Sequence, residues 1–460
     1  LGIAIIATFL FKSYAAVGRN NKDLTKYIIP YAFYDSGYKY LRDTYFYPPL
    51  PYKVLDKRPY LKGNANIHPS ITVLVVGETA RADKFSSNSY SRRTSPNIQN
   101  AGAISFSKVT SCGTATAVSV PCMFSRLSRE NYDSRIADSQ DNVLDIIHRA
   151  GVDVTWIDNN SSCKGVCKRV KTLDFDPSRD PKFCDGDYCY DEVLVDLLRE
   201  TLSRPSKEHR VIVLHMIGSH GPTYYRRYPE KFAKFVPDCP RSDIQNCEEA
   251  ELTNTYDNTI AYTDYVLGQI IEQLSTIPNS SMLYLSDHGE SLGEKGLYLH
   301  GFPYNLAPVE QTHVPMVYWA SKFSQPEYSD CVKSLSSHPY SHDNLFDTLL
   351  GLTNVQSSTY QPTQDILRID EATSKRHFDP KAKPKGMLRI VLAMKNSVRA
   401  ISWLVKNESA FRQELILLIL AAGVLAFWSI PYMEKAILLS SILFVLFAEI
   451  INTAIEVTID

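Results

Sequence analysis

Three short apolar runs stand out along the chain, and each ends in polar residues. They are residues 71–81 (ITVLVVGETAR), 211–222 (VIVLHMIGSHGP) and 282–289 (MLYLSDHG). Continuous runs of Val, Ile and Leu are typical of strands that are buried on both faces of a parallel sheet. Open α/β sheets bind ligands beyond the carboxyl ends of their strands. The pattern therefore predicts a site where five polar residues fall: Glu78, His215, His220, Asp287 and His288.

Between residues 67 and 367, strand-like runs alternate with stretches of helical periodicity, such as residues 141–150 and 251–274. This alternation is typical of α/β domains. We predict a catalytic domain over residues 67–369, in which helices sandwich a central, mostly parallel sheet.

The beginning of the chain has the composition of a membrane segment. The apolar stretch over residues 1–11 (LGIAIIATFLF) is shorter than the roughly 20 residues that a spanning helix needs. It predicts the end of a transmembrane helix over residues 1–18. Residues 19–66 are polar but rich in Tyr, Phe and Pro, which indicates either an interfacial linker or one packed on the globular domain.

The end of the chain again has membrane character. A polar hinge over residues 370–386 is followed by residues 387–408, where apolar residues at helical spacing alternate with Lys and Arg, as in helices on anionic membranes. Residues 415–430 and 436–451 are strongly apolar and predict a transmembrane hairpin. We expect an all-α membrane module over residues 387–460.

Charge and cysteine content narrow the class of protein. A net charge of −1 argues against nucleic acid as a general partner. Eight of the nine cysteines fall in close pairs, namely Cys112/Cys122, Cys163/Cys167, Cys184/Cys189 and Cys239/Cys247. These pairs lack the repeated CxxC motif of zinc ribbons, so they predict local disulfides. The sequence does not determine which cysteine bonds to which. Disulfides imply an oxidising compartment such as a bacterial periplasm, and Cys331 is left as a buried or free thiol.

The polar strand endings have the chemistry of a metal site. Carboxylates and an imidazole are ligands that a catalytic zinc accepts while one position stays open. We therefore predict that Glu78, Asp287 and His288 bind zinc.

A covalent phosphoryl transfer also needs a hydroxyl that is held against the metal near helical N–H groups. Residues 111–124 (SCGTATAVSVPCMF) provide Thr114, which we predict as the nucleophile. The same segment contains rival hydroxyls, namely Ser111, Thr116 and Ser119.

Three further basic residues follow related motifs: Lys164, His220 and His300. Each could bind a phosphate oxygen, protonate a leaving alkoxide or hold a second metal, and the residues alone do not choose among these roles. We predict no catalytic or binding role for His148, His209, His313 and His338.

In these motifs the chain resembles the periplasmic phosphoethanolamine transferases that act on lipid A. That family belongs to the alkaline phosphatase/sulfatase superfamily and includes the mobile colistin-resistance enzymes. The segments GETAR, SCGTATAVSVPCM, SSCKGVC, HMIGSHGPTYYRRYP and SDHGESLGEKGLYLHG occur in the family's order. The resemblance implies a zinc ion bound by Glu78, Thr114, Asp287 and His288, with Thr114 carrying the phosphoethanolamine.

The resemblance implies further roles around the zinc ion. His220 and His300 would serve the phosphate or a second zinc ion. Lys164, together with Asn160 and Ser161, would lie near the headgroup of the lipid donor.

The implied reaction takes place at the bacterial inner membrane, with the catalytic domain in the periplasm. Phosphatidylethanolamine would donate phosphoethanolamine, diacylglycerol would leave, and a lipid A phosphate would accept the group. The reduced negative surface charge would weaken binding of polymyxins such as colistin. The alternatives are another lipopolysaccharide acceptor, a sulfatase-like hydrolase, or a lipid-binding domain with a vestigial site. The segment around Thr114 lacks the CxPxR-like context of sulfatases.

Residues 387–460 resemble prokaryotic diacylglycerol kinase through ESAFRQE and EIINTAIE. Glu449, Asn452 and Glu456 share one helical face, and the resemblance implies that they bind Mg²⁺-ATP and the lipid hydroxyl. An interhelical polar contact is the alternative. Because later catalytic residues of that family do not follow, we expect this segment to be truncated and inactive. The disulfide-paired domain should be periplasmic, whereas the ATP site of a kinase should be cytoplasmic. No stretch between residues 71 and 386 is long and apolar enough to cross the membrane between them. We therefore expect either that the kinase-like segment is made as a separate product or that its topology is inverted.

Overall fold

The structure is a computed structural model of the 460-residue chain. It describes residues 50–62 and 70–368 without 174–176, 180, 187, 205, 207 and 325, together with residues 33–34, 36–38 and 41. The predicted segments 1–18, 370–386 and 387–460, including Glu449, Asn452 and Glu456, lie outside these residues. Within the described ranges, no helix combines the length and apolar character that crossing a bilayer requires.

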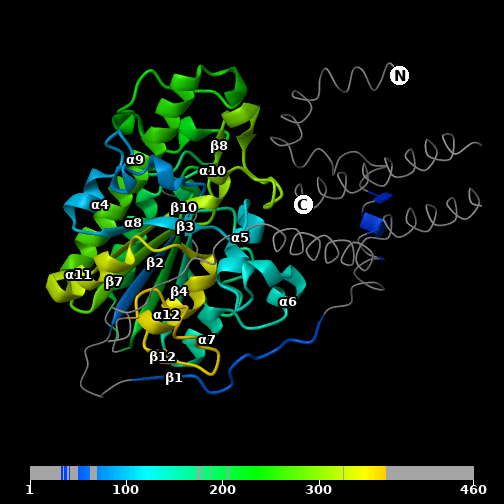
Figure 1. Ribbon diagram of the computed structural model, residues 1–460, viewed down its shortest axis with the longest axis vertical. Coiled ribbons are helices and arrows are strands. Elements are labelled where there is room, and N and C mark those ends of the chain that lie inside the picture. Colours follow the sequence, from blue (N-terminus) through cyan, green and yellow to red (C-terminus); the bar gives the residue numbers. More distant parts are fainter. Residues whose placement is uncertain are drawn as a thin grey trace, which may run out of the picture. The chain divides into compact units, whose positions relative to one another are not determined.

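A central sheet of eight strands organises the described domain (Figure 1). Its strands are β2 (Ile71–Gly77), β3 (Ile104–Thr110), β4 (Asp153–Asp158), β5 (Lys171–Leu173), β6 (Arg210–His215), β7 (Ser280–Ser286), β10 (His313–Ala320) and β11 (Tyr340–Ser341). Their order is β11-β3-β10-β7-β2-β6-β4-β5. In this sheet β10 pairs antiparallel with both neighbours and the other pairings are parallel, which confirms the predicted mostly parallel sheet.

Two short ladders accompany the sheet: β1 (Tyr60–Leu61) with β12 (Val355–Gln356), and β8 (Ser291–Leu292) with β9 (Tyr298–Leu299). The described helices are α4 (Pro96–Asn100), α5 (Thr116–Met123), α6 (Ser134–Asp138), α7 (Val143–Arg149), α8 (Glu192–Ser203), α9 (Glu249–Ser275), α10 (Val309–Thr312), α11 (Pro326–Leu335) and α12 (Leu345–Leu352). The helical periodicity at residues 141–150 and 251–274 therefore correctly predicted α7 and α9.

The sheet is buried on both faces, as its apolar runs predicted. Along β2, Val73 and Val75 pack in one apolar cluster with α8 and α9, whereas Leu74 and Val76 pack in a second cluster with α7 and α12. Successive side chains of a strand point to opposite faces, so both faces need apolar residues. Figure 1 shows α8 and α9 on one side of the sheet and α7 and α12 on the other.

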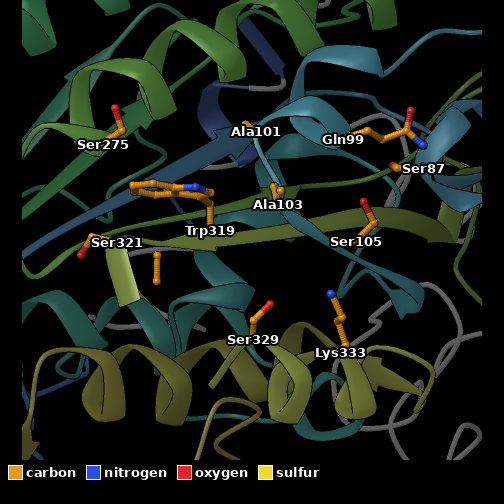
Figure 2. A pocket seen from close by; sticks show the side chains of 12 residues that line it. Ser87, Gln99, Ala101, Ala103, Ser105, Ser275, Trp319, Ser321, Ser329 and Lys333 are labelled. Atoms are coloured by element: carbon orange, nitrogen blue, oxygen red, sulfur yellow. The ribbon is translucent and has the colours of Figure 1, made fainter. Parts of the chain in front are cut away.

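A groove of about 750 Å³ lies where β3 begins and β10 ends (Figure 2). Its lining includes Ser105, Trp319 and Lys333. The groove is therefore at the opposite end of β3 from the segment that carries the predicted nucleophile.

The four predicted local disulfides are confirmed. They join Cys112 to Cys122, Cys163 to Cys167, Cys184 to Cys189 and Cys239 to Cys247, and Cys331 is a free thiol. Each pair closes a short loop, and the first pair ties the segment before α5 to the last turn of that helix.

Residues 50–62 pack against the domain. For this part of residues 19–66, the structure therefore favours a linker packed on the globular domain over one at the membrane interface. The buried carboxylate of Asp141 accepts hydrogen bonds from the Tyr52 hydroxyl and the Leu55 N–H, both at 2.8 Å. It also accepts two N–H bonds at 2.9 Å from Arg149 at the end of α7. One side chain thus joins the segment to a helix of the core.

We expect Asp141→Ala to lower the free energy of unfolding by about 2–3 kcal/mol, because it leaves Arg149, Tyr52 and Leu55 without their acceptor. Urea unfolding of the full chain, followed by tryptophan fluorescence, measures the change. The matched control is Asp196→Ala, which removes ion pairs on a partly exposed aspartate and should cost less than about 1 kcal/mol. Equal effects of the two substitutions would contradict this role of Asp141.

Candidate active site

The carboxylates of Glu78 and Asp287 meet because they follow neighbouring parallel strands. Glu78 follows β2 and Asp287 follows β7, and the last residues of these strands, Gly77 and Ser286, are paired in register. His288 comes next in the chain. Ligand atoms of Glu78, Asp287 and His288 all lie within 4.8 Å of one another, and the three residues are fully buried. The structure thus brings together the three residues predicted as metal ligands.

Asp287 keeps one carboxylate oxygen for a ligand. Its Oδ1 accepts hydrogen bonds from the backbone N–H groups of Thr79 at 3.1 Å and His288 at 2.7 Å. Its Oδ2 is buried and has no hydrogen-bond partner among the described residues. A buried polar atom without a partner is costly, and a cation at this point would remove that cost.

His288 presents one ring nitrogen to the carboxylates. Its Nδ1 lies 2.9 Å from the carbonyl oxygen of Gly289, so Nδ1–H donates there and Nε2 faces the cluster, where it can bind a metal ion once it has lost its proton. Nε2 lies 3.4 Å from Glu78 Oε1 and 3.5 Å from Asp287 Oδ2. This arrangement leaves the imidazole in the tautomer that a metal ion requires.

Glu78 is held by neutral donors on both oxygens. The hydroxyl of Thr79 donates to Oε1, and the side-chain amide of Asn160 donates to Oε2 at 2.9 Å. The sequence placed Asn160 near the donor headgroup and did not indicate its contact with a metal ligand.

Within residues 111–124, Thr116 contacts the cluster through its hydroxyl. It is the first residue of α5, and its Oγ1 lies 3.0 Å from Glu78 Oε2 and 3.3 Å from His288 Nε2. This contact favours Thr116, one of the rival hydroxyls, as the group beside the cluster, and the assignment of the nucleophile to Thr114 stays a prediction from the sequence. Because Ala115 before the helix is extended, α5 begins at Thr116, later than the small-residue run suggested.

Two glycines allow the strand ends to approach each other. A Cβ on Gly218 would lie 2.7 Å from the carbonyl oxygen of Glu78, and Gly218 has a positive φ of 47°. A Cβ on Gly289 would lie 2.0 Å from the carbonyl oxygen of Glu310. Only glycine permits these contacts without moving the backbone that carries the ligands.

His220 and His300 lie beside the cluster. The ring centroid of His300 is 4.4 Å from that of His288 and 6.1 Å from that of His220. The Nδ1–H of His300 donates to Glu290 at 3.2 Å. Burial lowers the pKa of His220 to about 4, so its imidazole is neutral at pH 7. His215, also at a strand end, instead pairs with Asp158 at 3.2 Å.

Lys164 and Ser161 extend from the cluster toward solvent. The backbone N–H of Ser161 donates to Asn160 Oδ1 at 2.6 Å, and the Lys164 ammonium donates to the Ser161 hydroxyl at 2.6 Å. Lys164 is partly exposed, whereas the side-chain amide of Asn160 reaches Glu78. These three residues therefore connect a surface cation to the buried carboxylate.

Comparison with known proteins gives the family. The sulfatase family model matches residues 70–355, and the model of phosphoethanolamine transferase EptA/EptB matches residues 1–45. Phosphoethanolamine transferase EptA of Salmonella typhimurium is 46% identical over 378 residues, which cover 80% of this chain and 68% of the relative. The chain belongs to the phosphoethanolamine transferase family.

Two further members and one other match complete the comparison. Phosphatidylethanolamine transferase Mcr-1 of Escherichia coli is 42% identical over 312 residues, which cover 65% of this chain and 56% of that protein. The integral membrane protein lipooligosaccharide phosphoethanolamine transferase A of Neisseria meningitidis is 43% identical, with a TM-score of 0.68 over 78% of this chain and 69% of that one. The prokaryotic diacylglycerol kinase model matches residues 395–460. The predicted resemblances and the sulfatase-like fold are confirmed.

The donor set of the site fits a divalent cation. Glu78, Asp287 and His288 offer two oxygens and a nitrogen, Thr116 adds a hydroxyl, and Asp287 Oδ2 lacks another partner among the described residues. Four such ligands suit zinc.

The charges of the metal-free site are balanced by a proton. Burial would raise the pKa of Glu78, but the hydrogen bond and charge of His288 hold it well below its usual value. Burial and the nearby charge of Glu78 raise the pKa of Asp287 to about 6. Burial would lower the pKa of His288, but Asp287 and Glu78 raise it to about 10. Without a metal ion, the positive charge of protonated His288 therefore offsets the negative charge of the carboxylates, a role that a bound cation would take over.

We expect zinc uptake at pH 8 to release about one proton per ion, because His288 must lose its proton to bind metal. The affinity should fall as the pH is lowered from 10, and fall more steeply below pH 6, where Asp287 also gains a proton. Isothermal titration calorimetry in two buffers of different ionisation enthalpy measures the released protons. His288→Gln is the control and should abolish the release. Zinc uptake by the unmodified chain without proton release at pH 8 would contradict this description.

Proposed function

We propose that the chain is a zinc-dependent enzyme that transfers phosphoethanolamine from phosphatidylethanolamine to a phosphate of lipid A. The observation that carries this proposal is the contact of the Thr116 hydroxyl with the buried cluster of Glu78, Asp287 and His288. The names of the relatives support the two lipids. The Escherichia coli protein is named a phosphatidylethanolamine transferase, and the Neisseria protein is named for lipooligosaccharide.

The proposed first step forms an ester of Thr116. A zinc ion held by Glu78, Asp287, His288 and Thr116 would supply positive charge that makes the threonine hydroxyl more acidic. Thr116 Oγ1 gives up its proton and attacks the donor phosphorus, while the bond between phosphorus and the diacylglycerol oxygen breaks. The leaving oxygen gains a proton and diacylglycerol is released.

The second step returns the enzyme to its starting state. An oxygen of a lipid A phosphate attacks the phosphorus, the bond between phosphorus and Thr116 Oγ1 breaks, and Oγ1 takes up a proton to restore the hydroxyl. The product carries an ethanolamine ammonium group near the former phosphate monoester, so the negative surface charge falls. Weaker attraction of cationic polymyxins, and hence colistin resistance, is the proposed consequence.

The surrounding residues have proposed roles that follow from their positions. His300, held by Glu290, and His220 are proposed to serve the transferred phosphate or a second zinc ion. Lys164, Ser161 and Asn160 are proposed to bind the donor headgroup. The four disulfides support a periplasmic location of the catalytic domain, at the inner membrane.

A second, separate proposal concerns residues 395–460, which match diacylglycerol kinase. The proposed transfer releases diacylglycerol, and a kinase of this class consumes it with Mg²⁺-ATP. Glu449, Asn452 and Glu456 stay predictions for that chemistry.

We expect Thr116→Ala to abolish the covalent intermediate and to reduce transfer to lipid A by roughly three orders of magnitude or more, because no nucleophile is left. Thr114→Ala is the matched control and should retain both. Intact-protein mass spectrometry of the full chain, after incubation with phosphatidylethanolamine, measures the adduct.

Two outcomes would contradict this assignment: an adduct that persists in Thr116→Ala, or one that is lost only in Thr114→Ala. Release of free phosphoethanolamine without modification of lipid A would instead identify a hydrolase.

A further inference from the structure

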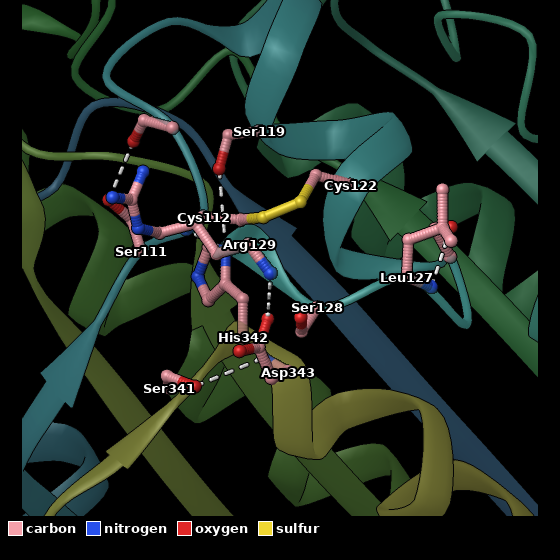
Figure 3. The surroundings of a disulfide bond; sticks show 12 residues. Ser111, Cys112, Ser119, Cys122, Leu127, Ser128, Arg129, Ser341, His342 and Asp343 are labelled. Carbon is pink, nitrogen blue, oxygen red and sulfur yellow. Dashed lines mark hydrogen bonds between the residues drawn. A yellow bond between two sulfur atoms is a disulfide. The ribbon is translucent and has the colours of Figure 1, made fainter. Parts of the chain in front are cut away.

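One buried histidine joins the segments that carry the proposed nucleophile and the metal ligands. His342 begins the short helix η11 (His342–Asn344), and only 1% of its surface is exposed. Figure 3 shows its ring close to Ser119 and to the disulfide between Cys112 and Cys122. The sequence assigned no role to His342.

Both ring nitrogens of His342 are used. The backbone N–H of Cys112 donates to Nδ1 at 3.0 Å, so Nδ1 is the unprotonated nitrogen. Nε2 carries the hydrogen and donates to the carbonyl oxygen of Ser286 at 3.0 Å. Burial lowers the pKa of His342 to about 3, which agrees with a neutral ring.

A third contact extends the link to α5. The hydroxyl of Ser119 lies 3.3 Å from His342 Nδ1 and donates to the carbonyl oxygen of Asp287. Ser119 is three residues after Thr116 on the same helix, and Cys112 is four residues before Thr116. Ser286 directly precedes Asp287. The imidazole therefore connects both sides of the threonine to the strand end that carries two metal ligands.

We propose that His342 is a positioning residue, which holds the hydroxyl of Thr116 at the metal cluster through the acceptor Nδ1. The inference rests on the proposed function, in which Thr116 is the nucleophile. His342 does not touch the reacting atoms, so its effect should fall on the rate of the chemical step and leave zinc and donor binding intact.

Three substitutions separate the two ring nitrogens. His342→Asn keeps an acceptor near the position of Nδ1, His342→Gln keeps a donor near the position of Nε2, and His342→Phe fills the space without either. The matched control is His209, whose Nδ1 likewise accepts a backbone N–H, that of Ser70, at the start of β2 and β6. The same three substitutions there remove the same chemistry from the other end of the sheet.

The experiment uses the full chain with phosphatidylethanolamine micelles as the donor, and it measures kcat, KM, bound zinc and the far-UV circular dichroism. We expect kcat to fall about 10- to 100-fold in His342→Gln and His342→Phe, with KM and zinc content within twofold of the unmodified chain. His342→Asn should regain most of the lost rate. The His209 variants should keep the full kcat.

Several results would overturn the proposal. One is a full kcat in His342→Gln, and another is an equal loss of kcat in the Asn and Gln variants. Loss of zinc or of folded structure together with kcat in those two variants would show a purely structural residue. Failure of the proposed function would be distinguishable, because the unmodified chain would then form no adduct.

Discussion

The site depends on one electrostatic constraint, which is the burial of two carboxylates side by side. Glu78 and Asp287 follow adjacent parallel strands, and their ligand atoms lie within 4.8 Å of each other and of His288. Two negative charges at this distance and depth repel each other unless a positive charge lies between them. A proton on His288 or a divalent cation can supply it, and the free oxygen of Asp287 favours the cation.

The surrounding structure serves this pair of charges. Neutral donors from Thr79 and Asn160 satisfy the outer lone pairs of Glu78, and a backbone carbonyl fixes the tautomer of His288. The hydroxyl of Thr116 joins the cluster from the start of α5. Close packing of the strand ends requires glycine at positions 218 and 289. The stability of the fold and the position of the Thr116 hydroxyl are therefore consequences of the same packing.

The sequence predicted the fold and the meeting of Glu78, Asp287 and His288 for a simple physical reason. Strands buried on both faces are largely apolar, so the first charged residue after β2 and after β7 marked the end of each strand. The helices α7 and α9 and the disulfides were equally local signals. The position of Thr116 was not a local signal, because its contacts with Glu78 and His288 join residues 38 and 172 positions apart. The contact between Asn160 and Glu78 spans 82 residues and was missed for the same reason.

The most direct test of the account is the position of the metal ion relative to the two threonines. Crystals of the full chain grown with zinc, measured at the zinc absorption edge, would locate the ion by anomalous scattering. The account predicts one strong peak about 2.0–2.2 Å from ligand atoms of Glu78, Asp287, His288 and the Thr116 hydroxyl. A peak bound by Thr114, or a zinc ion bound away from Glu78 and Asp287, would contradict it.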